Sequence, residues 1–533
     1  MKRIGIDFDN TIAIYSDVFR KVALKNKLIA KNWFGTKAEL RKKIIFEKNV
    51  EVWKKLQGQV YGAYMHNASP SKYLNEFILK AQILGSKIFI VSHKTEFGHY
   101  DEKKIKLRDE AIRWIKKKGY LKNIKIFFEN SIPEKIERIN SLKLDYFIDD
   151  LEIILNHKLI SKKTKKILFC ENINNSVSKK GYNWLQIKDL IFDNNNKSNL
   201  KKYIEFITNK KVDKINQLKG RKNSKIFKIR LNEKKIVIVK QYPERNLNDR
   251  RRIEREIEAL KILKKKKITN IPKIFYYNKI LNILIMEFIN GSTPKIIRSE
   301  DLNHTLNFIK KIKKLKKEIN NYPYYAVESC ENFQKLLNQI NYKINNLEEA
   351  SNRSKTLKHH LNKVLKKTFK NLMSSKKKTE FYKALIKKKN QKKLILSPSD
   401  FGFHNSIKFS KKIYFIDFEY FGIDDPVKLV IDFILHPGMS LNAEIKKKWI
   451  KENFRIFSDD KNFKKRLNFL IPFFAIRWAL IVLNDYKIKN VNEHCKKNNQ
   501  NKKIFLQERD RQIKKSIYFC YLVNTRKYLE WFN

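Results

Sequence analysis

Residues 4–12 read IGIDFDNTI, an apolar run that leads directly into two carboxylates, Asp7 and Asp9. A short buried strand followed by Asp-x-Asp places both carboxylates at the strand's carboxyl end, the edge where parallel α/β sheets bind ligands. One carboxylate there can attack phosphorus as a nucleophile, and the other can protonate the leaving group and then activate water. The stretch therefore predicts an α/β domain that acts on a phosphoester.

The pattern of the next 165 residues supports a parallel sheet. Residues 106–118 have helical spacing, and apolar positions at mixed three and four spacing make residues 15–80 helix-like. Short apolar runs with strand character occur at 87–91, 125–128, 146–148 and 166–170. Strands that alternate with helices favour a parallel α/β sheet.

Further polar residues follow these strands in an order that suits magnesium-assisted phosphoryl transfer. Ser92 follows the second strand, Lys135 lies in PEKIERI, and Asp149 and Asp150 end the strand YFIDD. A hydroxyl and an ammonium group can bind the phosphate, while an acidic pair can hold Mg²⁺. Lys143 is a nearby alternative to Lys135. The loop residues His93, Lys94 and His99 could touch substrate, but solvated loop positions are favoured.

With these motifs in this order, residues 1–192 resemble the haloacid dehalogenase superfamily of phosphohydrolases. The resemblance implies that Asp7 is the nucleophile and a metal ligand, and that Asp9 is the general acid and base. It implies phosphate contacts from Thr11, Ser92 and Lys135, and metal contacts from Asp149 and Asp150. Which of the last two ligates directly stays open. Residues 15–80 would form a small helical cap over the substrate.

A second domain is expected after a polar linker at residues 193–211, which begins with the Asn-rich stretch 193–201. Residues 226–230 and 235–240 have the pattern of paired strands, followed by a charged helix at 250–267 and a strand at 283–288. The chain from Leu302 onward is mostly helical, with a hairpin-like segment at 406–418. The second domain is thus assigned to residues 212–533.

The sharpest motif in this domain is LILSPSDFGFHNSI at residues 394–407, followed by Asp417 in YFIDFEY. A loop Asp can deprotonate a hydroxyl, an Asn five residues later can reach Mg²⁺, and a second Asp can bridge the metal to ATP phosphates. Asp400, Asn405 and Asp417 fit these three roles. Upstream, Lys240 ends a strand and Glu256 lies on the next helix, a spacing that suits the pair that holds ATP phosphates.

These motifs make residues 212–533 similar to the aminoglycoside phosphotransferase and choline kinase family. The resemblance implies that Asp400 is the catalytic base, that Asn405 and Asp417 are metal ligands, and that Glu256 orients Lys240 toward ATP. It also implies nucleotide contacts from Gly220, Met286 and Phe288, with Met286, Glu287 and Phe288 as the hinge beside adenine. Pro398-Ser399 replaces the family's usual His-Gly before the catalytic Asp, which separates this chain from the antibiotic-resistance members.

Three neighbouring features of the second domain have simpler interpretations. Asp425-Pro426 has the pattern of a helix N-cap followed by proline at the first helical position. Arg477 and Trp478 are expected to pack in the core, with the Arg paired, although they could line the acceptor pocket. Glu419 is left open between a structural role and a supporting role in the site.

Composition narrows the remaining classes of function. The formal net charge is +64, which suits nucleic acid. However, Lys, Asn and Ile, which have AT-rich codons, are abundant throughout, while Gly and Pro, which have GC-rich codons, are scarce. This pattern favours a compositional origin of the positive charge over a nucleic-acid-binding function. The four cysteines form no CxxC pair, so a reducing cytoplasm is expected. Residues 467–483 form the most membrane-like stretch, but Pro472 and Arg477 interrupt it, and a core helix is expected.

The sequence thus predicts an α/β chain: a Rossmann-like parallel-sheet hydrolase domain with a small helical cap, fused to a two-lobed, α+β, protein-kinase-like phosphotransferase domain. The expected function is bifunctional, with a Mg²⁺-dependent phosphatase and an ATP-dependent kinase for small hydroxyl acceptors, in sugar-phosphate or surface-polysaccharide precursor metabolism. The alternative is a nucleic-acid end-processing or binding protein, but the chain contains no GxxxxGK[ST] motif.

Overall fold

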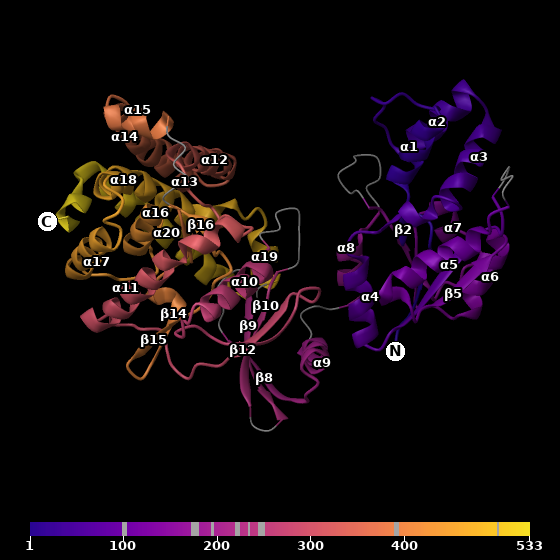
Figure 1. Ribbon diagram of the computed structural model, residues 1–533, viewed down its shortest axis with the longest axis horizontal. Coiled ribbons are helices and arrows are strands. Elements are labelled where there is room, and N and C mark those ends of the chain that lie inside the picture. Colours follow the sequence, from indigo (N-terminus) through magenta and orange to yellow (C-terminus); the bar gives the residue numbers. More distant parts are fainter. Residues whose placement is uncertain are drawn as a thin grey trace. The chain divides into compact units, whose positions relative to one another are not determined.

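The chain forms two compact units. The computed structural model describes residues 1–98, 104–171, 181–192, 197–218, 224–232, 235–243, 251–387, 394–497 and 500–532. Unit 1 comprises residues 1–216 and 229–235, and unit 2 comprises residues 217–228 and 236–533 (Figure 1).

Unit 1 is built on a five-stranded sheet with the order β5-β4-β1-β6-β7, in which every neighbouring pair is parallel. The strands are β1 (Arg3–Ile6), β4 (Lys87–His93), β5 (Lys125–Glu129), β6 (Tyr146–Asp149) and β7 (Lys165–Leu168). The predicted parallel sheet is therefore confirmed. Because β1 lies at its centre, Asp7 leaves the sheet between the ends of β4 and β6, where a ligand can be reached from both neighbours.

Helices cover this sheet and extend beyond its carboxyl edge. Those nearest the sheet are α4 (Leu74–Ile83), α5 (Leu107–Lys117), α6 (Ile132–Ser141), α7 (Glu152–Leu155) and α8 (Trp184–Ile191). A separate group, which stands together above the sheet in Figure 1, contains α1 (Ser16–Lys25), α2 (Lys37–Glu47) and α3 (Val50–Tyr61). The short strands β2 (Ala13–Ile14) and β3 (Ser69–Pro70) pair at its base. Phe19 stacks on Trp53 between α1 and α3, at 5.2 Å between ring centroids, so this group has an aromatic core.

The expected linker contains a helix. Residues 193–196 lie outside the described residues, but Lys197–Thr208 form α9. Leu200, Tyr203 and Ile204 are buried along one side of it, at the three and four spacing of an amphipathic helix. The abundance of Asn and Lys in this stretch obscured that periodicity, and the helix at residues 197–208 was not predicted.

A second five-stranded sheet has the order β11-β12-β10-β9-β8. Its strands are β8 (Val212–Leu218), β9 (Lys225–Leu231), β10 (Ile236–Gln241), β11 (Ile274–Asn278) and β12 (Ile283–Glu287). The helix α10 (Arg252–Lys265) follows β10, and β10 pairs antiparallel with β12, with Lys240 opposite Leu284. The strands that hold Lys240 and the 286–288 segment are thus neighbours.

From residue 299 onward, unit 2 is mainly helical, as expected. Its helices are α11 (Ser299–Lys313), α12 (Phe333–Ser351), α13 (Lys355–His359), α14 (Lys366–Lys377), α15 (Glu380–Lys387), α16 (Pro426–Leu435), α17 (Ala443–Ile456), α18 (Phe463–Ile481), α19 (Val491–Lys497) and α20 (Lys502–Thr525). Two small antiparallel pairs interrupt the helices, β13 (Ile395–Ser397) with β16 (Gly422–Asp424) and β14 (Ser406–Phe409) with β15 (Lys412–Phe415). These pairs carry the motif that contains Asp400 and Asp417. The strand β16 was not predicted.

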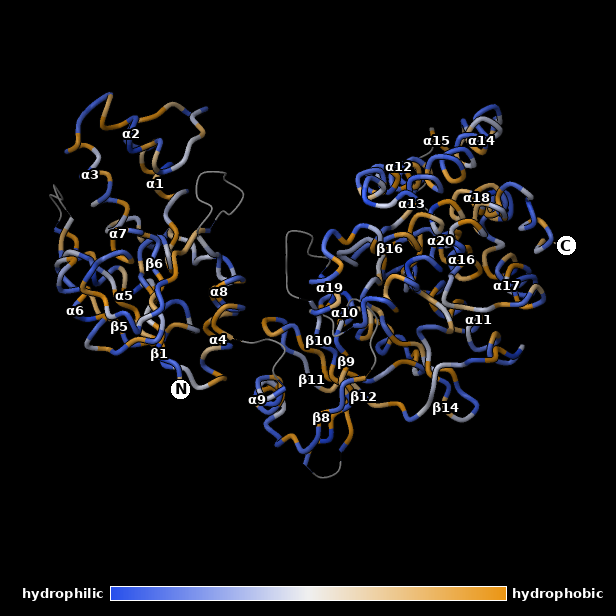
Figure 2. Tube along the Cα trace, turned by 180° about the vertical axis from the view of Figure 1, so that it is seen from behind, coloured by the Kyte–Doolittle hydropathy of each residue, from blue (hydrophilic) through white to orange (hydrophobic). Residues whose placement is uncertain are grey.

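Helix α18 is the core helix of this part. Within the described residues, one stretch, Phe463–Lys487, is long and apolar enough to cross a membrane, and 78% of its most apolar window is buried inside the structure. Figure 2 shows its largely hydrophobic colouring. Its Arg477 is 4% exposed and donates to Glu328 Oε2 at 2.8 Å, so the charge inside the helix is paired. Burial and pairing agree with the expected core helix.

Candidate active sites

The first candidate site is centred on Asp7, immediately after β1. The amide of Asp7 donates to the carbonyl of Ile148 in β6 at 2.8 Å, which aligns the end of β1 with Asp149. Lys135 Nζ lies 2.7 Å from Asp7 Oδ1 and 2.7 Å from Asp149 Oδ2. The three residues are at most 4% exposed. The structure therefore brings together a carboxylate from each of two neighbouring strands and one ammonium group.

The start of helix α6 places Lys135 in this site. The Ser131 side chain caps the helix by accepting from the amide of Glu134, and Pro133 occupies the first turn, so Lys135 lies one turn from a well-defined helix start. Lys143, the alternative, is exposed at the other end of α6 with a positive φ of 46°. Of the two lysines, Lys135 is the one that contacts the carboxylates.

Asp9 has two partners that were not predicted. Lys94 Nζ lies 3.1 Å from both carboxylate oxygens of Asp9, and the Tyr15 hydroxyl donates to Oδ1 at 2.6 Å. Lys94 is only 3% exposed, so its expected place in a solvated loop was wrong. Its amide still donates to the carbonyl of Glu129 at the end of β5, at 3.0 Å, which continues the sheet edge and turns the side chain inward. His93 is exposed as expected, and His99 lies outside the described residues.

The remaining predicted residues of this site lie at the same edge of the sheet. Ser92 is the next-to-last residue of strand β4 and is 1% exposed, and Thr11 is fully buried. The Thr11 hydroxyl donates to Asp150 Oδ1 at 3.4 Å. Asp149 Oδ1 accepts from the amide of Leu151 at 2.9 Å, so both its oxygens have partners, whereas Asp150 extends toward Thr11.

The negative charges of the carboxylates in this site are only partly offset by the positive charge of Lys135. Burial raises the pKa of Asp7 well above its ordinary value against the opposing effect of Lys135, and Asp149 adds to the rise. Burial, with Asp149 as the next cause, raises the pKa of Asp150 to about 6. Oxygens of Asp7, Asp149 and Asp150 lie within 4.8 Å of one another. Oxygen ligands at this spacing fit a Mg²⁺ ion, whose charge would offset the excess of carboxylates.

The second candidate site is centred on Lys240, at the end of β10. Lys240 Nζ lies 2.6 Å from Glu256 Oε2 on α10, 2.5 Å from Asp417 Oδ1 and 3.1 Å from Glu419 Oε2. Lys240 is 3% exposed, and Glu256 is 1% exposed. Glu256 also accepts from the amide of Phe418 at 3.3 Å. The residues predicted at separate motifs therefore meet at one ammonium group.

Other side chains hold this cluster in place. Glu419, whose role the sequence left open, pairs with Arg252 and accepts from the Ser224 hydroxyl at 2.8 Å. The Tyr242 hydroxyl donates to Glu256 Oε2 at 2.6 Å. Tyr242 lies two residues after Lys240, so in an extended chain the two side chains point to the same face. That spacing is the signal that could have indicated the role of Tyr242. Gly220, predicted to contact nucleotide, lies outside the described residues.

Among the carboxylates around Lys240, Asp417 is the one whose negative charge is least offset by neighbouring cations. Burial raises its pKa to about 6, although Lys240 acts in the opposite direction, and Glu419 adds to the rise. Its side chain is 29% exposed, whereas that of Glu419 is 4% exposed. A cation that reached Asp417 would offset this unfavourable charge, so the residue fits the predicted role of metal ligand.

The loop after β13 holds Asp400 and Asn405. The Asn405 Nδ2 group donates to Asp400 Oδ2 at 3.1 Å and to the Asp400 carbonyl at 2.9 Å. Because the Nδ2 group of Asn405 is used in these two hydrogen bonds, the Oδ1 atom of Asn405 is the one that could ligate a metal. The amide of Ile416 donates to the Asn405 carbonyl at 3.0 Å, which joins this loop to the segment that carries Asp417. Ser399, which precedes Asp400, has a φ of 65°, in the left-handed region.

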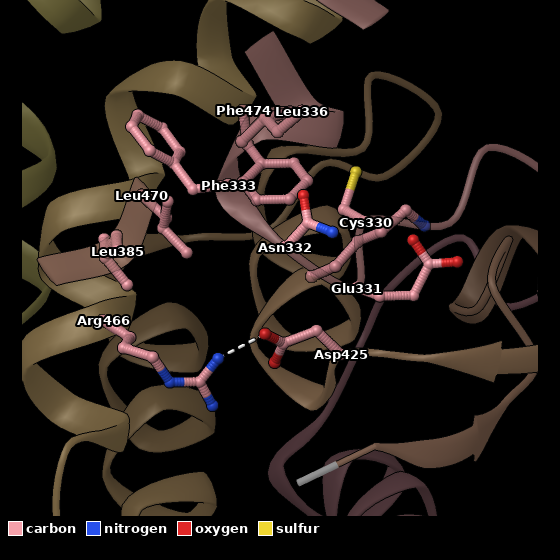
Figure 3. A pocket seen from close by; sticks show the side chains of 11 residues that line it. Cys330, Glu331, Asn332, Phe333, Leu336, Leu385, Asp425, Arg466, Leu470 and Phe474 are labelled. Carbon is pink, nitrogen blue, oxygen red and sulfur yellow. Dashed lines mark hydrogen bonds and ion pairs between the residues drawn. The ribbon is translucent and has the colours of Figure 1, made fainter. Parts of the chain in front are cut away.

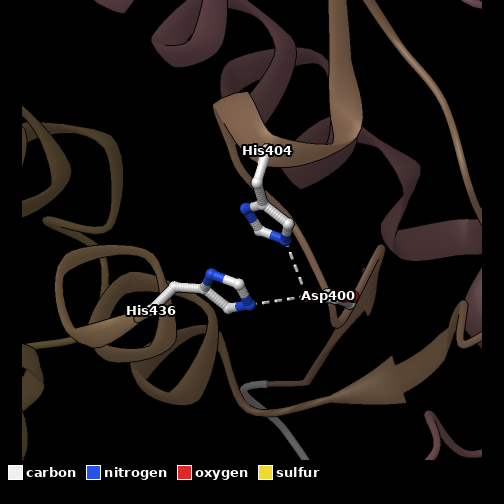
Figure 4. A group of neighbouring side chains, drawn as sticks. All are labelled: Asp400, His404 and His436. Atoms are coloured by element: carbon white, nitrogen blue, oxygen red, sulfur yellow. Dashed lines mark hydrogen bonds and ion pairs between the residues drawn. The ribbon is translucent and has the colours of Figure 1, made fainter. Parts of the chain in front are cut away.

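Two histidines that the sequence analysis did not assign contact Asp400. The Nε2 atoms of His404 and His436 lie 2.9 Å and 3.4 Å from the same oxygen, Oδ1 (Figure 4). Burial opposes ionisation of Asp400, but the hydrogen bonds from both histidines hold its pKa well below the ordinary value. His436 is 36 residues away at the end of α16, and no sequence spacing indicated it.

The predicted hinge residues lie at the end of β12. Met286 and Glu287 end the strand, and Phe288 follows it. Met286 is 6% exposed, and Lys228 Nζ lies 3.9 Å from the centroid of the Phe288 ring. Because β12 pairs with β10, this segment and Lys240 belong to neighbouring strands.

Described residues of unit 2 line a small cavity and a much larger one. The smaller, of about 30 Å³, is lined by Phe333, Phe474 and the ion pair of Arg466 with Asp425 (Figure 3). It has room for a water molecule or two but not for a substrate. Asp425 caps α16 by accepting from the amide of Val427 at 2.8 Å, so the predicted N-cap is confirmed.

The larger cavity, of about 450 Å³, lies beside His436. Lys446, Lys514, Lys515 and Tyr518 are among its lining residues. Trp478 does not line it; its indole nitrogen donates to Asp432 at 2.8 Å. The cavity is large enough for a small metabolite, and its lysines favour an anionic one.

No family model matches the chain, and no curated protein matches it. Among solved structures, it is similar to an ADP-bound aminoglycoside phosphotransferase, APH(2'')-Ib, at 15% identity over 62% of this chain and 99% of that chain, with a TM-score of 0.38. It is similar to choline kinase from Cryptosporidium parvum Iowa II at 12% identity, over 60% and 92%, with a TM-score of 0.40. A third is a spectinomycin phosphotransferase in complex with ADP and spectinomycin, at 12% identity, over 61% and 98%, with a TM-score of 0.41. At TM-scores below 0.5 these likenesses transfer no activity to this chain.

Proposed function

We propose that unit 2 is an ATP-dependent kinase that phosphorylates a hydroxyl group of a small molecule. The observation that carries this proposal is the convergence of Glu256 and Asp417 on Lys240, together with Asp400 and Asn405 on the adjoining loop. A strand Lys paired with a helix Glu, a loop Asp with an Asn five residues later, and a second Asp are the groups that phosphoryl transfer from ATP requires.

Each residue then has a distinct task. Lys240, fixed by Glu256, binds ATP phosphates, and Asp417 and Asn405 supply oxygen atoms for Mg²⁺. The magnesium ion, when bound, offsets the negative charge of the transferring phosphoryl group. Asp400 orients the acceptor hydroxyl and takes its proton. The 286–288 segment lies at the end of β12, the strand paired with the one that holds Lys240, and is proposed to contact adenine.

Replacement of Lys240 by alanine tests the ATP site. The variant loses the only ammonium group that joins Glu256 and Asp417 among the described residues, and it leaves buried carboxylates without their partner. We expect both weaker ATP binding and a fall in kcat of roughly 10²–10³-fold, as for the loss of a charge-stabilising group. ATP titration and initial rates measure the two effects.

A matched control is Lys408→Ala, because Lys408 pairs with Asp301 elsewhere in unit 2, at 2.6 Å. This variant should keep the wild-type kinetics. Unchanged ATP affinity and kcat in the Lys240→Ala variant would contradict the assignment of the ATP site.

We further propose that unit 1 is a Mg²⁺-dependent phosphohydrolase. The specific observation is the contact of Lys135 with both Asp7 and Asp149, beside Asp9. Asp7 would attack phosphorus and form an aspartyl phosphate, with Lys135 and Ser92 binding phosphate oxygens. Asp9, held by Tyr15 and Lys94, would give a proton to the leaving group and take one from the attacking water. Helices α1–α3 would act as the cap.

The two activities can act on different positions of one metabolite, which avoids a futile cycle. The cavity beside His436, with Lys446, Lys514 and Lys515 at its wall, supports an acceptor that already carries a phosphate. We therefore propose that the kinase adds one phosphate and that the hydrolase removes another, as in the preparation of sugars for surface-polysaccharide precursors in the cytoplasm. The free thiols of the four cysteines agree with that compartment.

This sequence of reactions predicts relocation of a phosphate. When sugar phosphates are supplied with ATP and Mg²⁺, phosphorus NMR should show a bisphosphate that gives way to a monophosphate with the group at a new position. The Asp7→Asn variant should accumulate the bisphosphate, because only removal is blocked. If the product of unit 2 is never consumed by unit 1, the joint pathway is wrong, although both separate activities could stand.

A further inference from the structure

The polar contacts of Asp400 are distributed unequally between its two oxygens. His404 Nε2 is hydrogen-bonded to Oδ1 at 2.9 Å and His436 Nε2 lies 3.4 Å from the same oxygen, whereas Asn405 reaches Oδ2 at 3.1 Å (Figure 4). A carboxylate oxygen has two lone-pair directions. The two imidazole rings therefore surround Oδ1, whereas Oδ2 has one amide donor and can still meet an acceptor hydroxyl.

The backbone determines which nitrogen of His436 carries the proton. The amide of Gly438 donates to His436 Nδ1 at 3.1 Å, so Nδ1 is an acceptor. In a neutral imidazole the proton then lies on Nε2, which faces Asp400. His404 also presents Nε2 to the carboxylate, where a proton makes the contact favourable. Both rings can thus donate to Asp400 in their neutral form.

Packing holds both rings in this position. They stack at 3.6 Å between centroids with an interplanar angle of 5°, and the His436 ring meets Trp478 edge to face at 4.9 Å. The side chain of His404 is 1% exposed. A Cβ atom at Gly402 would lie 2.9 Å from His404 Nδ1 and 2.5 Å from the sulfur of Met439, so the absence of a side chain there allows the close approach.

The same stacking argues against a metal ion held by the two histidines and Asp400. A metal binds in the plane of an imidazole ring at about 2.1 Å from the nitrogen. The rings are parallel and 3.6 Å apart, so an ion in the plane of one ring lies well out of the plane of the other. Metal binding by both rings would need the stack to open, whereas the contacts of the two Nε2 atoms with Oδ1, at 2.9 Å and 3.4 Å, tolerate a wider range of angles and form with the rings as they stand.

We propose that His404 and His436 are positioning residues that occupy Asp400 Oδ1 and so direct the acceptor hydroxyl to Oδ2. This rests on the proposed kinase function of unit 2. The hydroxyl oxygen forms its bond to the γ-phosphorus of ATP as the bond from that phosphorus to the β,γ-bridging oxygen breaks, which releases ADP. The hydroxyl proton passes to Oδ2 and then to solvent. The histidines remain hydrogen-bond donors throughout.

The test compares leucine with glutamine at each histidine. Glutamine keeps an N–H donor near the place of Nε2, and leucine does not. Transfer from Mg-ATP is measured with water as acceptor, in the Asp7→Asn background so that unit 1 does not contribute. We expect His404→Leu and His436→Leu to lower kcat about 10²-fold, the cost of misplacing a reacting group, with little change in KM for ATP. The glutamine variants should recover most of kcat.

A matched control is His360→Leu, because His360 is also buried in unit 2 and contacts Ser516 at 2.7 Å. It should leave kcat unchanged. Wild-type kcat in both leucine variants, or glutamine variants as slow as the leucine ones, would overturn the positioning role. If Asp400→Asn itself keeps wild-type turnover, the proposed kinase function fails instead.

Nitrogen NMR of labelled histidines gives a measurement that needs no turnover. We expect the Nε2 nitrogens of His404 and His436 to carry the protons that face Asp400, with both signals shifted by Asp400→Ala and the His360 signal unchanged. An Nδ1–H tautomer at either position, or a Zn²⁺ affinity that depends on Asp400, would contradict the proposal.

Discussion

Replacement of Asp400 by asparagine is expected to lower the turnover of phosphoryl transfer by roughly 10²–10⁴-fold, the usual contribution of a general base. Asparagine has nearly the same shape, but its amide cannot take the proton of the acceptor hydroxyl. ATP binding should be nearly unchanged, because Lys240, Glu256 and Asp417 form a separate cluster. Steady-state rates and nucleotide titration measure these two quantities.

The control for this substitution is Asp459→Asn. Asp459 is a half-exposed carboxylate of unit 2 that pairs with Lys313 and Lys316 at the surface, so its loss should not affect kcat. The role of Asp400 as base would be wrong if Asp400→Asn transferred phosphate at the wild-type rate, or if the loss appeared only in ATP affinity.

Replacement of Asp7 by asparagine is expected to abolish phosphate release by unit 1. The amide is too weak a nucleophile to form the aspartyl phosphate, and loss of a nucleophile costs on the order of 10⁶-fold in a well-studied hydrolase. The fold should persist, because Lys135 keeps its contact with Asp149 at 2.7 Å. Release of inorganic phosphate from small phosphoesters is the measurement, and thermal unfolding checks the fold.

Asp145→Asn provides the matched control. Asp145 is an exposed carboxylate that precedes β6, at the opposite edge of the same sheet, and accepts from the amide of Arg3 at 2.7 Å. It should keep full phosphatase activity. If the Asp7→Asn variant released phosphate at the wild-type rate, the nucleophile would have to be a different residue.

Much of the fold follows from local patterns in the sequence. The apolar runs of unit 1 predicted all five strands of its sheet to within two residues, because buried parallel strands form short continuous apolar stretches. Helix α9 and strand β16 were missed. In α9, Asn and Lys obscure the apolar spacing, and β16 has only three residues, which is too short for a periodic signal.

Residues of the candidate sites could be predicted only where the members of a functional pair lie close together in the sequence. Asp400 and Asn405 lie five apart on one loop, and Lys240 and Glu256 occupy consecutive elements, so spacing indicated both pairs. Lys94, Arg252 and His436 were not indicated, because their roles depend on contacts that only the folded chain creates. The burial of Lys94 against Asp9 is an example, since nothing in its neighbouring residues distinguishes it from a solvated lysine.

The most direct test of two separate phosphoryl-transfer centres on one chain is a crossed assay of four proteins: wild type, Asp7→Asn, Asp400→Asn and the double variant. Each is assayed for phosphate release from a phosphoester and for transfer from labelled ATP to a hydroxyl acceptor. We predict that Asp7→Asn loses only release, that Asp400→Asn loses only transfer, and that the double variant loses both. Loss of both activities in either single variant, with the fold intact, or their survival in the double variant would contradict this account.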